Sequence, residues 1–230
     1  MENFEYIKNN YLALRDEIDT LAHRLGTPPP TLVAVTKSGS DEELVALVKA
    51  GAVDIGENRP GEVLRRGELL RNAGFTPRMH EIGTLQRNKV KLIIDSVHLI
   101  HSIDSVKLAH DVDRLAAARG RVVPVLIEVN SAREENKSGV LPEECEALLN
   151  SISDFSSIRV TGLMTMGPVC DNPEDIRPYF RRTKELFDSL SKKYGFGDSP
   201  ILSMGMSDSY KVAIEEGSTL VRVGRRLFIK

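Results

Sequence analysis

The chain has 230 residues, and its 31 basic and 33 acidic residues leave a net charge of −2. Folding at this length buries roughly 70% of the unfolded surface, which is enough for a large hydrophobic core. The charge balance lacks the basic excess typical of nucleic-acid binding. With no Trp and 5% aromatic residues, base-stacking surfaces and a membrane-interface belt are also not expected. We therefore predict no nucleic-acid and no membrane partner.

The N-terminal segment and the cysteines indicate a cellular compartment. The segment MENFEYIKNNYLALRDEI is charged throughout and has no signal-peptide core, and no run of the sequence is long enough to span a bilayer. The two cysteines, Cys145 and Cys170, form neither a disulfide framework nor a metal-ligand spacing. We predict a cytoplasmic protein with two free thiols and no metal site.

The first predicted element is a helix over residues 3–25, where apolar residues recur at helical spacing; Gly26 follows as a C-cap and TPPP as a stiff connector. Strand-like and helical segments then alternate. The predicted strands are 32–36, 53–56, 79–83, 98–102, 122–130, 159–166, 201–205 and 219–224. The predicted helices are 41–50, 60–73, 84–94, 105–119, 142–151, 174–194 and 208–216. Ser40 and Glu43 form a capping box at the first of these helices, and Gly51 follows it.

These elements predict the fold class. The strands are mostly continuous apolar runs, which is typical of parallel strands covered on both faces. Eight strands, seven intervening helices and one leading helix predict an α/β fold, a single (β/α)8 TIM-type barrel with an extra N-terminal helix, in one domain over residues 1–230. The alternative is an open doubly wound sheet, which usually has a Gly-rich first turn; KSGSDEE does not match GxGxxG.

In such a barrel, ligands bind where the strands end. The residues predicted at these ends are mostly small or polar: Lys37, Gly56 to Asn58, His80, Gly83, His101, Ser102, Asn130, Met164, Met166, Ser203, Gly205, Ser207, Arg222 and Gly224. One lysine and one arginine stand among glycines and serines, with few carboxylates. This composition favours an anion and a carbonyl compound over a metal ion.

The last two strands lead into SMGMSDS and VRVGRR, and the loops at these positions are the usual phosphate site of the fold. We expect Lys37 to face that phosphate across the barrel mouth. A lysine amine placed there can attack an aldehyde and form a Schiff base. Phosphate, aldehyde and lysine together describe pyridoxal 5′-phosphate.

Each of these residues also has a purely structural interpretation. The alternatives are a snorkelling surface lysine for Lys37, a helix cap for Asn58 or Ser207, a hydrogen-bonded core position for His80 or His101, and an ion pair with Glu57 for Arg222.

The segments LVAVTK, DIGEN, HEIGTLQRNK, HSIDS, EVNSAREENKSGV, GLMTM and LSMGMSDSYKVAIEEGSTLVRVG resemble, in order, the pyridoxal phosphate homeostasis protein family. Its members look like the N-terminal barrel of alanine racemase standing alone, and the resemblance runs from about Leu32 to Phe228. It implies that Lys37 carries pyridoxal phosphate as an aldimine. The other implied contacts are Ser207 and the backbone of Gly224 and Arg225 at the phosphate, Arg222 facing the pyridine nitrogen, and Asn58, Met206 and His80 around the ring.

The resemblance implies a role in homeostasis or delivery of the cofactor, with pyridoxal-phosphate-dependent apoenzymes as candidate partners, and without robust catalysis. No tyrosine is obviously placed as the second base of a racemase, and the chain ends six residues after Gly224, so we expect a monomer that is not an enzyme. The alternatives are a weak amino-acid racemase or lyase and a Schiff-base aldolase acting on a sugar phosphate.

Three positions depart from the family pattern. Arg225 stands where the family usually has Thr or Ser, Glu81 stands where an aromatic or apolar residue is usual, and the GEN motif continues as RPGE. The Arg225 backbone is therefore expected at the phosphate, and the role of its side chain is left open.

Overall fold

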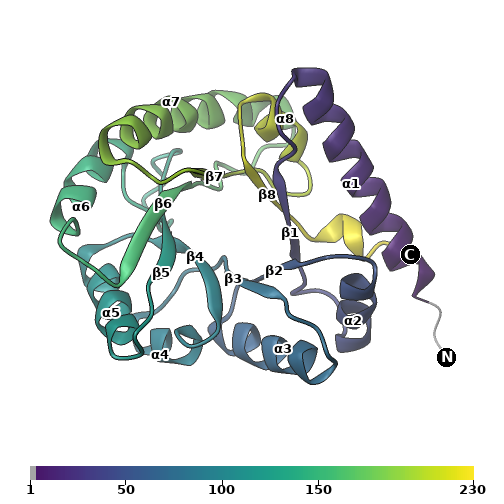
Figure 1. The fold of residues 1–230 in the computed structure, drawn as a ribbon. Helices are drawn as coiled ribbons and strands as arrows, with labels where there is room; N and C mark the ends of the chain where they lie inside the picture. The colour runs from purple at the N-terminus through teal and green to yellow at the C-terminus, as the bar shows by residue number, and fades with distance from the viewer. Residues whose placement is uncertain (1–3) are drawn as a thin grey trace.

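The structure is a computed structural model and describes residues 4–230. Its centre is a closed barrel of eight parallel strands in the order β1 to β8 (Figure 1). The strands are β1 Thr31–Val35, β2 Asp54–Glu57, β3 Arg78–Glu81, β4 Val97–Ile103, β5 Val123–Glu128, β6 Ile158–Met164, β7 Ile201–Ser203 and β8 Leu220–Val223. The predicted TIM-type barrel is confirmed. The open sheet is wrong, because β1 pairs with both β2 and β8 and leaves no edge.

Helices surround the barrel (Figure 1). The α-helices are α1 Glu5–Leu25, α2 Asp41–Lys49, α3 Pro60–Asn72, α4 Val90–Ile93, α5 Val106–Ala117, α6 Cys145–Ser151, α7 Arg177–Tyr194 and α8 Tyr210–Glu215. The 3-10 helices are η1 Arg87–Lys89, η2 Pro142–Glu144, η3 Pro173–Ile176 and η4 Arg225–Leu227. None of the helices between residues 4 and 230 combines the length and the apolarity needed to cross a bilayer.

The leading helix α1 packs on the outside of the barrel, against α2, α8 and η4 (Figure 1). Its buried face is apolar, with Ile7, Leu14 and Ile18 almost fully shielded from solvent. Gly26 ends the helix at φ 67°, as predicted, because this left-handed conformation favours glycine. The predicted start of the helix at residue 3 lies outside the described residues.

Several predicted elements differ from the structure: the strands expected over 122–130 and 159–166 end at Glu128 and Met164, and two further elements differ as follows. The helix expected over 84–94 is only η1 followed by the single turn α4. A Cβ on Gly83 would lie 2.3 Å from the Asn58 carbonyl oxygen, so the chain after β3 runs tightly against the end of β2 and begins its helix late. The strand expected over 201–205 ends at Ser203, because Gly205 has φ +93°, which is outside the β region.

The core has two parts. Most apolar side chains lie between the strands and the outer helices. A smaller cluster lies inside the barrel and is formed by Val33, Leu99, Leu126, Met164 and Leu220. The barrel interior also holds fully or nearly fully buried polar side chains, including two histidines, a serine and an arginine. A polar barrel interior beside an apolar cluster is costly unless its groups are hydrogen-bonded, and these groups form part of the candidate site.

Candidate functional site

Lys37 stands at the end of β1, at the mouth of the barrel. It is exposed and follows the buried Thr36. The Thr36 hydroxyl donates to the carboxylate of Glu57 on the neighbouring strand. Val33, four residues before Lys37, belongs to the cluster inside the barrel. Lys37 itself lies in the turn that follows β1, which a hydrogen bond from the Gly39 N–H to the Thr36 carbonyl oxygen closes at 2.9 Å.

The neighbour of Lys37 is the end of β8. Strand β1 pairs with β8 through Val33 and Arg222, and a Cβ on Gly224 would lie 2.9 Å from the Val35 carbonyl oxygen. The prediction that Lys37 faces the phosphate loops across the barrel mouth is therefore wrong for the β8 loop. Since the barrel closes between β1 and β8, Lys37 lies beside that loop.

The loops after β7 and β8 are joined by a hydrogen bond. The Gly224 N–H donates to the Ser207 hydroxyl oxygen over 3.3 Å. Helix α8 has Ser209 at its N-cap position, so the alternative that Ser207 caps this helix is wrong. The Ser209 hydroxyl accepts from the Met206 N–H at 3.1 Å and holds the loop. Ser207 keeps its own O–H, which can donate to a ligand.

This pair of loops has the donors that a phosphate requires. Among residues 4–230, the backbone N–H groups of Ser207 and Arg225 have no acceptor of the protein. A side chain at position 224 would collide with β1, so Gly224 permits the close approach of the two strand ends. The Arg225 guanidinium pairs with Asp208, and both side chains are exposed. What Arg225 offers at the loop is therefore its backbone N–H, while its charge is shared with a carboxylate.

Arg222 lies inside the barrel and is 3% exposed. Its Nη1 donates to the Ser203 hydroxyl at 2.6 Å, and its Nη2 donates to the Thr165 carbonyl oxygen at 3.1 Å. Burial lowers its pKa to about 10, which still leaves it cationic at neutral pH. The alternative of an ion pair with Glu57 is wrong, because Glu57 lies outside the barrel wall and pairs with Arg66 at 2.8 Å.

His80 and His101 are both buried inside the barrel, as the core interpretation predicts. His80 hydrogen-bonds to Asp54 and to His101, each over 3.0 Å, and His101 reaches Ser203 over 3.0 Å. All four ring nitrogens therefore have a partner within the protein. Within residues 4–230, the hydrogen bonds that connect His80 to Arg222 run through His101 and Ser203.

Asn58 and Met206 are exposed at the rim. Asn58 follows β2 directly, but Arg59 occupies the N-cap position of α3, so the alternative that Asn58 caps this helix is wrong. Met206 is 40% exposed although it is apolar. Lys37, Asn58 and Met206 are thus all exposed in the loops that follow β1, β2 and β7.

Sequence analysis missed one residue of this mouth, Glu128 at the end of β5. It is 4% exposed, its Oε1 accepts from the Ser138 hydroxyl at 2.8 Å, and its Oε2 has no partner among the described residues. Glu128 lines a cavity of about 20 Å³ together with Ser131 and Met166. Burial raises the pKa of Glu128. Its position as a carboxylate within the apolar run of the predicted strand 122–130 was the available signal.

Glu81 follows the pattern of an apolar residue despite its carboxyl group. It is fully buried, and its Oε1 accepts from the Gly83 N–H at 3.1 Å. Burial, together with the nearby charge of Glu57, raises the pKa of Glu81 to about 8. Glu81 is therefore mostly protonated at neutral pH, which explains how an acid occupies this position.

The site offers no ligand set for a metal ion. Within the part of the chain that the structure describes, no group of three or more His, Cys, Asp or Glu side chains could hold one. The donors at the mouth are instead an amine, a guanidinium, hydroxyls and backbone N–H groups. These groups suit a small anion that carries a carbonyl group.

Residues 10–229 match the model of the family described as the N-terminal domain of alanine racemase. Solved alanine racemase from Corynebacterium glutamicum (TM-score 0.76, 19% identity) shares the fold, and this chain covers 61% of its length. The chain is thus an alanine-racemase-type barrel.

Closer relatives define the family within that class. The chain is 43% identical to the pyridoxal phosphate homeostasis protein of Aquifex aeolicus over 86% of this chain and 85% of the relative. It is 32% identical to the pyridoxal phosphate homeostasis protein of Escherichia coli K12 over 96% and 95%. PipY of Synechococcus elongatus, solved with pyridoxal phosphate bound, has a TM-score of 0.84 at 27% identity, over 97% of this chain and all of that one. The chain belongs to the pyridoxal phosphate homeostasis protein family.

Proposed function

We propose that this protein binds pyridoxal 5′-phosphate at the mouth of its barrel, through a Schiff base to Lys37, and acts in the homeostasis of the cofactor. The observation that carries the proposal is the joining of the Ser207 and Gly224 loops beside the end of β1. It brings a hydroxyl and unpartnered N–H groups next to a lysine. PipY, a structural relative over nearly the whole chain, was solved with this cofactor bound.

Different residues of this chain bind different parts of the cofactor. Ser207 and the backbone N–H of Arg225 bind the phosphate, Gly224 holds the Ser207 hydroxyl at this loop through its N–H, and Arg222 faces the pyridine nitrogen. A guanidinium is a cation with only N–H donors, so it cannot accept a hydrogen bond from a protonated pyridine nitrogen and favours the unprotonated form. Lys37 supplies the amine, and Asn58 and Met206 line the ring at the open rim.

A carrier role suits this mouth better than a catalytic one. Lys37, Asn58 and Met206 are exposed, so solvent reaches the place where the cofactor binds, and the cofactor can leave. Two tyrosine hydroxyls are committed elsewhere: Tyr210 donates to Glu17, and Tyr194 donates to Asn150 over 2.8 Å. We therefore propose that a monomer passes the cofactor to apoenzymes without robust turnover.

The experiment that tests the binding proposal combines absorption and mass spectrometry. The purified protein, incubated with pyridoxal phosphate, is expected to show a visible band that borohydride removes, with the pyridoxyl mass on Lys37. The Lys37→Ala variant should lose the band and keep its fold, while Lys91→Ala, which changes an exposed lysine on α4, should leave it unchanged. A reducible band that persists in Lys37→Ala would assign the linkage to another lysine and refute the proposed site.

A second variant tests the phosphate contact. Ser207→Ala removes one hydrogen bond to a charged group, which is worth about 1–3 kcal/mol, so the Kd should rise about 5- to 150-fold. An unchanged Kd would remove Ser207 from the site. Incubation of the loaded protein with single amino-acid enantiomers is expected to leave their optical activity unchanged; steady racemisation would refute the carrier role and leave the binding site intact.

A further inference from the structure

A row of hydrogen-bonded side chains crosses the barrel interior. It begins at Asp54, the first residue of β2, and ends at Arg222 on β8. The heavy-atom distances are 3.0 Å from Asp54 Oδ1 to His80 Nε2, 3.0 Å from His80 Nδ1 to His101 Nε2, 3.0 Å from His101 Nδ1 to Ser203 Oγ, and 2.6 Å from Ser203 Oγ to Arg222 Nη1. All five residues are at most 7% exposed.

When both imidazoles are neutral, the chemistry of the two ends fixes the direction of every bond. Arg222 has only donors and cannot accept a hydrogen bond. At the other end, burial alone would raise the pKa of Asp54, but hydrogen bonds from His80 and Arg78 outweigh it and bring the pKa below its ordinary value. Asp54 is therefore a carboxylate at neutral pH and can only accept.

One proton arrangement satisfies the whole row with both imidazoles neutral. Arg222 donates to Ser203, the Ser203 hydroxyl donates to His101 Nδ1, His101 Nε2–H donates to His80 Nδ1, and His80 Nε2–H donates to Asp54. The neutral state of His101 agrees with its environment, because burial, with His80 and Arg222 nearby, lowers its pKa well below the ordinary value. Ser203, His101 and His80 each accept one hydrogen bond of the row and donate the next one, and no donor faces another donor.

From this geometry we propose that Asp54, His80 and His101 are positioning residues that, through Ser203, hold the Arg222 guanidinium in one orientation at the barrel mouth. The inference about the cofactor rests on the proposed function, in which Arg222 faces the pyridine nitrogen. The row itself is a property of the protein without ligand. It extends the site from the carboxyl end of β7 to the amino end of β2, where Asp54 meets Arg78 at 2.5 Å.

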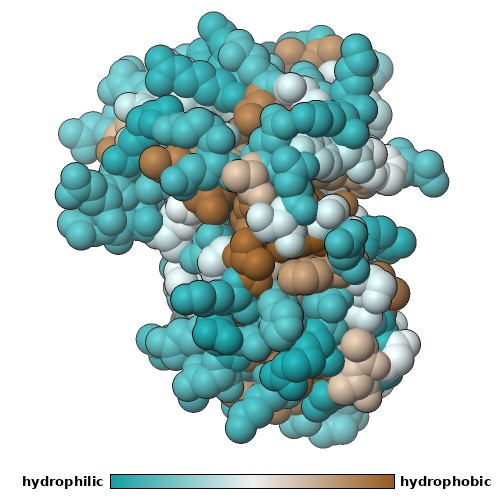
Figure 2. All heavy atoms as spheres, turned by 90° about the vertical axis from the view of Figure 1, so that its left-hand side faces the viewer, coloured by the Kyte–Doolittle hydropathy of each residue, from teal (hydrophilic) through white to brown (hydrophobic). Residues whose placement is uncertain are grey.

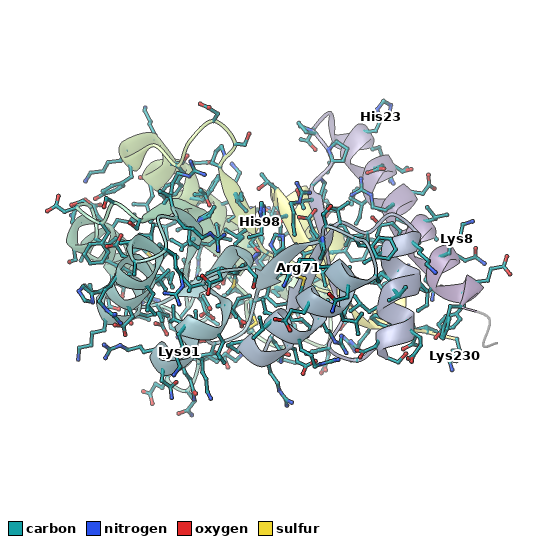
Figure 3. All side chains as sticks on the ribbon, turned by 60° about the horizontal axis from the view of Figure 1, so that its bottom comes forward. Lys8, His23, Arg71, Lys91, His98 and Lys230 are labelled. Atoms are coloured by element: carbon teal, nitrogen blue, oxygen red, sulfur yellow. The ribbon has the colours of Figure 1, made fainter. Side chains whose placement is uncertain are left out.

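Other charged groups around the row are few. His98 on β4 is labelled in Figure 3, and the centre of its ring lies 5.4 Å from that of the His80 ring. Arg78 and Arg121 act electrostatically on His98. Glu128 on β5 is the carboxylate that acts on Arg222 from across the barrel. His98 forms no hydrogen bond of the row, so it provides a matched control.

The free protein gives the first test. Nitrogen-15 NMR of the histidine rings at pH 7, without cofactor, is expected to show both His80 and His101 as the neutral tautomer protonated at Nε2. Either ring protonated at Nδ1, or doubly protonated, would overturn the proposed direction of the row. Asp54→Asn removes the acceptor-only end, so the pattern of His80 should change, while His98→Gln should leave both tautomers as they are.

The loaded protein gives the second test. Its visible band is titrated in the unmodified protein and in Ser203→Ala, Asp54→Asn and His98→Gln. When the Arg222 guanidinium is held less firmly, its positive charge acts less strongly on the ring of the cofactor. The pH midpoint of the visible band should therefore rise by about half a unit or more in Ser203→Ala and in Asp54→Asn. The His98→Gln midpoint should not move.

The outcomes separate this inference from the proposed function. A band in every protein with one common midpoint would refute the positioning role and leave cofactor binding intact. The absence of any band in the unmodified protein would refute cofactor binding, and the tautomers of the free protein would still decide whether the row is directed. Thermal unfolding of each variant verifies that it is folded before its midpoint is compared.

Discussion

The buried acid Glu81 should make the stability of this protein fall as the pH rises. Burial raises its pKa from 4.5 to about 8. Between these two values the unfolded chain has lost the proton and the folded chain keeps it, so raising the pH favours unfolding. The stabilisation is fully present below about pH 4.5 and is lost as the pH rises through about 8.

The expected magnitude follows from the same two values. At about 1.4 kcal/mol for each pH unit, the difference amounts to a loss on the order of 5 kcal/mol in the free energy of unfolding. Glu57 and Glu128 also have raised pKa values, mainly through burial, and add to the loss in the same direction. The part of the pH dependence of the unfolding free energy that comes from Glu81 must therefore be isolated by substitution.

Glu81→Gln isolates it, because an amide has the shape of the protonated acid and its oxygen can still accept from the Gly83 N–H. Urea unfolding between pH 5 and 8.5 should show a clearly flatter pH dependence in this variant and a higher stability than the unmodified protein at pH 8. The control is Glu68→Gln, which changes an exposed acid on α3 and should keep the original slope. An unchanged slope in Glu81→Gln would show that the acid is already ionised in the folded state.

Three further predictions concern the barrel wall, the thiols and the leading helix. Gly162→Ala should prevent folding, since its Cβ would lie 1.8 Å from a β7 carbonyl oxygen, whereas Gly61→Ala, with nothing within 4 Å, should keep the unfolding temperature or raise it. A thiol reagent should label Cys170 quickly and leave Cys145 unlabelled until the protein unfolds, because burial raises the Cys145 pKa to about 12; equal rates would contradict this. Glu17→Gln should lower the free energy of unfolding by about 1 kcal/mol at neutral pH, because it removes the ion pair to η4 at 2.7 Å. This contribution is lost as the pH falls from 4.5 to about 2, since hydrogen bonds from the η4 arginine and Tyr210 lower the Glu17 pKa; identical acid unfolding of the two proteins would refute it.

Figure 2 shows the outer face on the left-hand side of Figure 1. This face, which carries α6 in Figure 1, is mostly hydrophilic, with a small group of hydrophobic residues near its middle. A larger cavity, of about 230 Å³, is lined by residues that include Arg133, Arg182 and Leu186. Arg133 is already paired with Glu143 at 2.7 Å, so the cavity offers at most one unpaired guanidinium from these two arginines.

Local patterns were sufficient to predict most of the fold. The capping box of Ser40 and Glu43 is present with both hydrogen bonds, and Gly26 ends α1 as expected, because these signals act over only a few residues. The continuous apolar strands predicted parallel pairing, which all eight strands adopt. The prediction of one helix over 84–94 was wrong, because the chain at Gly83 is in close contact with Asn58 after the neighbouring strand β2. A local sequence pattern does not encode this contact.

The sequence by itself determined the element order, the parallel barrel and the set of polar residues at the strand ends, since strand periodicity and the rule that ligands bind at the carboxyl ends require no long-range information. Only the tertiary structure decided which of those residues meet. It placed Lys37 beside the β8 loop, turned Arg225 to Asp208, and joined His101 to Ser203, which lie 102 positions apart along the chain. Such contacts depend on how a closed barrel brings distant strands together, and no local pattern encodes them.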